Sequence, residues 1–110
     1  MAITSNVKQT IALTGDGLAQ KYVGASATTI TKARIMSVYG QATAADAEIK
    51  IYNEADSSKT AKALVFHVKF SNADNHGQSF TVPGEGIYCN AGMYVDLTNC
   101  DFCTIIGTFT

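Results

Sequence analysis

The sequence contains no tryptophan, one proline and two histidines among its 110 residues. Charged residues make up only 15% of the chain, the net charge is -1, and the eight Lys and Arg residues are spread along the sequence. A nucleic-acid-binding surface normally gathers Lys and Arg to neutralise phosphates, so this balance argues against that class. A free monomer usually carries a larger charged share on its surface. The low charge therefore indicates that partners cover part of this surface.

Long apolar segments are also missing. No apolar run reaches the roughly 18–20 residues that a helix needs to span a bilayer. The first residues show no basic region followed by an apolar one, so no signal peptide is expected. Amphipathic repeats of period 3.6 are absent as well, which argues against a layered α/β fold.

Short segments rich in β-branched and aromatic residues, separated by turn signals, run through the whole chain. In residues 93–98, after the turn residues Pro83, Gly84 and Gly86, apolar and polar side chains alternate, as in a strand with one buried face. Further strands are expected at residues 7–14, 18–23, 28–39, 47–53, 63–70, 78–82, 87–89 and 102–109, with a loop at 40–46. About eight strands predict one all-β domain over residues 1–110, an antiparallel β-sandwich or a jelly-roll-like small barrel.

The side chains with the most reactive chemistry are three cysteines and two histidines: Cys89, Cys100, Cys103, His67 and His76. An odd number of cysteines without an export signal predicts reduced thiols. Cys100 and Cys103 have C-x-x-C spacing, but an odd offset in a strand places them on opposite faces. A set of Cys89, Cys100, Cys103 and His76 matches no standard zinc module. We expect packing roles for the cysteines and neither a metal nor a cofactor.

Patterns of catalysis are not evident either. No serine lies in a G-x-S-x-G elbow, and no Cys–His pairing is indicated for His67 in mid-strand or His76 in a polar loop. The segments 15–17 and 72–75 contain Asp and Asn but lack the ligand order of an EF-hand, so turns are expected there. The sequence therefore predicts a protein that is not an enzyme.

Five residues are candidates for contact with another chain. Tyr39, Tyr52 and Tyr94 lie opposite or beside apolar faces, which predicts a second, partly exposed sheet face. Tyrosine suits interfaces because it offers a large rigid surface and one polar group. Val65 and Ile106 are apolar but fall at the alternating positions that should face away from the core. They indicate that these strands are covered on both sides. Cross-strand packing within one sheet is the alternative.

Two ends of the chain resemble a known family. The opening Thr4-Ser5-Asn6-Val7-Lys8, running to the 15–17 turn, resembles the start of small structural proteins of tailed bacteriophages, especially from marine and cyanobacterial hosts. The ending, from Gly86-Ile87-Tyr88 through Gly92-Met93-Tyr94-Val95-Asp96-Leu97-Thr98, is similar to their glycine–aliphatic–tyrosine–valine–aspartate strand. Residues 49–52 with the polar turn after them also fit their layout. The cysteines and the 63–70 strand depart from the simplest members.

The resemblance implies a virion component that is made in the host cytoplasm and placed on the capsid surface. Its role would be that of a capsid decoration or cement protein bound to the major capsid protein, and such proteins often form homotrimers at symmetry axes. Two other functions fit an all-β module: a carbohydrate-binding β-sandwich, which the lack of tryptophan weakens, or an adhesion module associated with a tail or fibre. A cupin-type enzyme would need clustered histidines.

Overall fold

The computed structural model describes residues 9–15, 17–18, 20–23, 26–71 and 77–110. His76, the turn expected at 72–75, Asp16 and the first two residues of the expected 7–14 strand lie outside these ranges. The elements in chain order are β1 (Gln9–Leu13), β2 (Gly17–Leu18), β3 (Gln20–Val23), β4 (Ser26–Thr29), β5 (Ala33–Ala42), β6 (Ala47–Tyr52), the 3₁₀ turn η1 (Ala61–Ala63), β7 (Leu64–Phe70), β8 (Gly77–Thr81), β9 (Ile87–Cys89), β10 (Tyr94–Thr98) and β11 (Cys100–Phe109).

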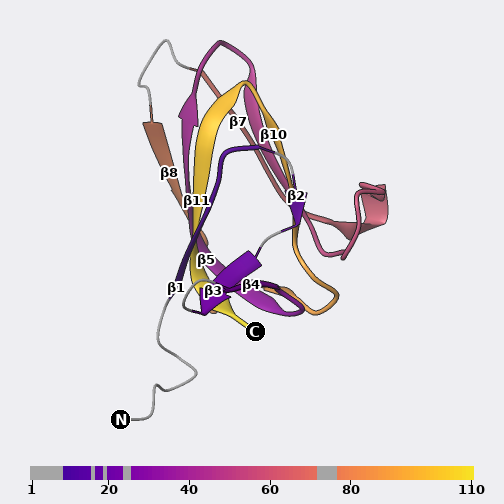
Figure 1. Ribbon diagram of the computed structural model, residues 1–110. Coiled ribbons are helices and arrows are strands. Elements are labelled where there is room, and N and C mark those ends of the chain that lie inside the picture. Colours follow the sequence, from indigo (N-terminus) through magenta and orange to yellow (C-terminus); the bar gives the residue numbers. More distant parts are fainter. Residues whose placement is uncertain (1–8, 16, 19, 24–25, 72–76) are drawn as a thin grey trace.

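Two antiparallel sheets face each other and confirm the predicted all-β sandwich (Figure 1). The five-stranded sheet has the order β1-β11-β5-β8, and β9 also pairs with β5. The four-stranded sheet has the order β2-β10-β6-β7, while β3 and β4 form a separate small hairpin. Apart from β2, β3 and β4, eight strands form the body of the described fold.

The core lies between the two sheets and is made by the inward positions of the long strands. Ile35 and Val38 of β5, Ile49 and Ile51 of β6, and Ile105 of β11 are fully buried there. Buried and more exposed positions alternate along most of these strands, as the period-two pattern predicts, except that β5 has two half-buried residues between Ile35 and Val38 and that Tyr52 after Ile51 is also buried. Burying one such side chain contributes about 1.5–3 kcal/mol, so this alternation fixes which face of each strand turns inward.

Two of the connections between the sheets, β5 to β6 and β10 to β11, lie at the same end of the sandwich, near the top of Figure 1. Asp46 lies in the connection from β5 to β6 and Asn99 alone connects β10 to β11; their φ angles are 61° and 52°. Asp and Asn tolerate this left-handed region better than most residues. The backbone N–H of Thr43 donates to the carbonyl of Asn99 at 2.8 Å and fastens the two connections together.

The strand expected at 28–39 and the loop expected at 40–46 are both corrected. The expected strand is interrupted after β4. There the N–H groups of Thr31 and Lys32 donate to the Thr110 carbonyl at 2.8 and 3.2 Å. The next strand, β5, continues to Ala42 through Gly40. A Cβ on Gly40 would lie 2.5 Å from Cδ1 of Ile49. The glycine is therefore a small core position in a strand rather than a loop residue.

The expected opposite orientation of Cys100 and Cys103 is wrong because a bulge lies between them. Cys100 pairs with Ala42 and Cys103 with Gly40, two inward positions, while the register skips Asp101. The extra residue shifts the parity of the strand. Cys103 is fully buried and Cys100 is partly buried against the same core.

Candidate interface on the outer faces of the sandwich

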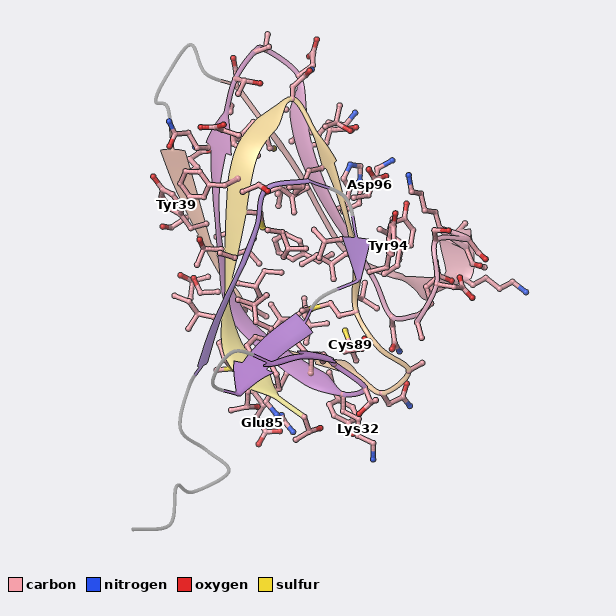
Figure 2. All side chains as sticks on the ribbon, in the orientation of Figure 1. Lys32, Tyr39, Glu85, Cys89, Tyr94 and Asp96 are labelled. Atoms are coloured by element: carbon pink, nitrogen blue, oxygen red, sulfur yellow. The ribbon has the colours of Figure 1, made fainter. Side chains whose placement is uncertain are left out.

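The two outer faces of the sandwich differ in chemistry. Figure 2 shows Tyr39 on one side of the molecule and Tyr94 and Asp96 on the opposite side, with Cys89 between the sheets. We call the outer surface of the four-stranded sheet the charged face. It carries Glu48, Lys50, His67, Lys69 and Asp96.

Ion pairs link these side chains across neighbouring strands. Oε1 of Glu48 lies 3.2 Å from Nε2 of His67 and 3.5 Å from Nζ of Lys69. The hydrogen bond from His67 lowers the pKa of the Glu48 carboxyl, with Lys69 acting in the same direction. Because these side chains are partly exposed, water screens the pairs and each contributes little to stability.

A segment between β6 and β7, residues 53–63, lies beside this face; we call it the cover segment. Nζ of Lys59 is 6.0 Å from the centroid of the Tyr94 ring and 3.5 Å from Oδ2 of Asp96. Tyr52 and Tyr94, which pair across β6 and β10, are only 6% and 9% exposed. The expectation that these two tyrosines are partly exposed is therefore wrong, since the chain itself covers them.

Hydrogen bonds from one side chain fasten the cover segment to the loop before β10. Oδ1 of Asn53 accepts from the N–H of Ala91 at 2.8 Å, and Nδ2 of Asn53 donates to Oδ1 of Asn90 at 3.0 Å. Gly92, at φ +122°, allows close packing, because a Cβ there would lie 3.1 Å from the Glu54 carbonyl oxygen. These hydrogen bonds attach the start of the cover segment to the loop that leads into β10.

The outer surface of the five-stranded sheet, the neutral face, is built mainly from hydroxyl, amide and aromatic side chains. Its outward residues, by strand register, are Ala12, Arg34, Ser37, Tyr39, Gln41, Ser79, Thr81, Tyr88, Phe102, Thr104, Ile106 and Thr108. The middle of this face consists of two cross-strand rows, Thr104–Tyr39–Ser79 and Ile106–Ser37–Thr81. Neither row contains a charge.

Charged residues lie at the two ends of the neutral face. At one end Nη1 of Arg34 donates to the Glu85 carbonyl at 3.0 Å, and its guanidinium lies 5.7 Å from the ring centroid of Tyr88. Tyr88 is 52% exposed, the one large hydrophobic side chain that is exposed in the described ranges. Asp101, the bulge residue, is exposed at the other end, next to Phe102.

The structure brings together two of the five predicted interface residues. Tyr39 and Ile106 share the neutral face, and both are half-buried there. Val65 does not join them. The pairing of β7 with β6 skips Val65, between Phe66 and Leu64, and its side chain packs against the core, which corrects its predicted outward position. Whether any of these residues contacts a partner stays a prediction.

Sequence reasoning missed Phe102 and Tyr88. The ring of Phe102 lies 5.8 Å from that of Tyr39, so the two form one aromatic pair on the neutral face. Phe102 has the same parity as Ile106, a signal that could have revealed it. Tyr88 gave no such signal, since its outward position follows from the pairing of β9 with β5.

The three thiols are packed rather than gathered in a reactive site. Burial raises the pKa of Cys89 to about 11 and that of Cys103 to about 12. Sγ of Cys100 donates weakly to the carbonyls of Glu48 and Thr98 at 3.5 and 3.4 Å. Within the described ranges, no group of three or more His, Cys, Asp and Glu side chains could hold a metal ion.

Comparison of the chain with models of protein families, with curated proteins and with solved structures found no match. Among the described residues, no helix has the length and apolar character that crossing a membrane would require. The candidate site is therefore defined by its own geometry, a broad sheet surface with an uncharged middle.

Proposed function

We propose that this chain is a non-enzymatic virion structural protein, a capsid decoration or cement protein that binds the outer surface of the major capsid protein shell and stabilises it. The neutral face is the observation that carries the proposal. A β-sheet surface whose middle holds hydroxyl and aromatic side chains and no charge is suited to burial against another protein. The resemblance of residues 4–17 and 86–98 to tailed-phage structural proteins supports the same assignment.

A cement protein acts by binding alone. Anything that binds the assembled shell and not its separated subunits shifts the equilibrium towards the shell. A shell presents many equivalent sites, so modest contacts at each site add up. The resemblance also implies a homotrimer at a symmetry axis, and cyclic symmetry would suit such a position.

Co-sedimentation tests the proposal directly. The purified chain is mixed with empty shells assembled from the major capsid protein of the same genome and centrifuged at physiological salt. We expect the chain to pellet with shells at a fixed stoichiometry and to raise the temperature at which the shells dissociate. Sedimentation of the free chain gives its oligomeric state, with a trimer expected.

Two results would count against a capsid role. One is the absence of pelleting with shells across a range of chain concentrations. The other is binding on a glycan array that is lost in Tyr88→Ala, which would support the carbohydrate-binding alternative, because Tyr88 is the exposed ring available for stacking on a sugar.

A further inference from the structure

The two outer faces differ in how much free energy it would cost to remove their water when a partner docks. On the charged face a partner would have to remove water from Lys50 and from Glu48, whose carboxylate already pairs with His67 and Lys69. Removing water from charged groups is costly unless the partner replaces every lost interaction. The middle rows of the neutral face carry no such cost, since they expose hydroxyls, rings and an aliphatic side chain.

The neutral face also offers much of the area that a specific contact needs. Its longest strands, β5 and β11, each have ten residues. At about 3.4 Å per residue and about 4.8 Å between strands, the 33 residues of the five strands cover roughly 540 Å². A standard interface buries about 800 Å² per partner. The strands of this sheet face alone therefore supply about two thirds of a standard footprint.

The position of the charges on the neutral face fits an interface rim. Arg34 and Asp101 lie at opposite ends, and interfaces in general have few charges at the centre and polar groups around it. At the Arg34 end, the Glu85 carbonyl and the Tyr88 ring hold the guanidinium, so little side-chain freedom remains to be lost on binding. Tyr and Arg are also the residue types that most often dominate binding energy.

From these observations we infer that the neutral face docks on the capsid shell, while the charged face and the cover segment remain in water. The inference rests on the proposed function and names the surface that performs it. It also specifies the partner: the shell presents an uncharged patch of hydroxyl and apolar side chains. Binding should accordingly depend little on salt, because few ion pairs form across the contact.

A matched pair of threonines tests the inference. Thr104 lies in the middle of the neutral face on the interior strand β11, and Thr98 lies exposed on the charged face in β10. Thr104→Lys should raise the Kd for empty shells at least tenfold, whereas Thr98→Lys should stay within about twofold of the unmodified chain. Ser79→Lys, at an exposed position beside Tyr39, repeats the test where folding is not at risk. Circular dichroism and thermal melting verify that each variant folds.

Each outcome of these binding measurements either supports the inference or overturns it. Loss of binding by Thr104→Lys and Ser79→Lys alone, with a Kd that changes less than about threefold between 50 and 500 mM NaCl, supports the inference. Loss by Thr98→Lys alone, or equal binding by all variants, overturns the inference but leaves the capsid role standing. If the unmodified chain does not bind shells, both fail. If Thr104→Lys only converts a self-associated chain into monomers, the face belongs to contacts between copies and the inference is overturned.

Discussion

Gly107 lies at the bulge where β11 crosses from its pairing with Ser37 to its pairing with Ile35. A Cβ added there would overlap the carbonyl oxygen of Arg34 and lie 3.0 Å from that carbonyl carbon and 3.3 Å from the Cα of Ile35. These are backbone atoms of β5, which also pairs with β8 and β9. The substitution Gly107→Ala therefore cannot be absorbed by rotating a side chain.

The cost of this substitution follows from the strand separation it forces. Losing two or three ladder hydrogen bonds, at about 1 kcal/mol each and more where a buried group is left unpaired, outweighs the 0.4–1 kcal/mol or so that alanine gains through the unfolded chain. We expect Gly107→Ala to lower the free energy of unfolding by about 2–4 kcal/mol, a large part of the roughly 5–15 kcal/mol typical of a domain. At about 4 °C per kcal/mol, the Tm falls by about 8–16 °C.

Urea unfolding followed by far-UV circular dichroism measures this loss, and calorimetry measures the Tm. Gly15→Ala is the control, since no heavy atom lies within 4 Å of its added Cβ and its φ is not in the left-handed region. It should be as stable as the unmodified chain or up to about 1 kcal/mol more stable, because alanine has less freedom in the unfolded chain. A Gly107→Ala protein as stable as the control would refute the reasoning.

Three further predictions concern the cover segment and the thiols. Asn53→Ala removes two hydrogen bonds that hold the cover segment and should cost about 1–2 kcal/mol while changing the near-UV dichroism of Tyr94; an unchanged spectrum would contradict the covering role. Ellman's reagent at pH 8 should label at most Cys100 in the folded protein and all three thiols in urea, so rapid labelling of Cys89 or Cys103 without denaturant would be inconsistent with their burial. Because burial raises the pKa of Cys89 to about 11 and that of Cys103 to about 12 from 9.0, the unfolded chain loses these protons first as pH rises. The free energy of unfolding should therefore fall from about pH 9 upward, and Cys103→Ala should make that decline shallower, as urea titrations at several pH values can measure.

The alternation of apolar and polar residues was sufficient to predict which side chains are buried where a strand alternates along its whole length. Residues 47–52 and 93–98 alternate in sequence, and β6 and β10 bury Ile49, Ile51 and Val95 as that alternation requires. The same alternation gave the wrong orientation where an extra residue in a strand turns the side chains before it to the other face. The bulge at Asp101 turned Cys100 inward, and nothing in the local sequence marks a bulge there.

The outer faces show a second limit of sequence reasoning. Parity correctly placed Tyr52 and Tyr94 away from the core side of their strands, but exposure also depends on what lies above the sheet. Lys59 of the cover segment lies over the Tyr94 ring, and Asn53 holds the segment to Ala91, and both contacts join residues far apart in sequence. The neutral face needed the same information, because its rows of side chains exist only once β5, β8 and β11 are known to be neighbours.

The position of β11 bears on how the chain acquires its structure during synthesis. This strand, residues 100–109, sits in the interior of the five-stranded sheet, between β1 and β5, and pairs Gln9 with Gly107. A nascent chain still held on the ribosome before residue 109 has emerged lacks the strand that joins these two partners. Completion of that sheet must therefore wait until residues 100–109 have been made, and the long sequence separation of its pairs favours folding in milliseconds to seconds rather than microseconds.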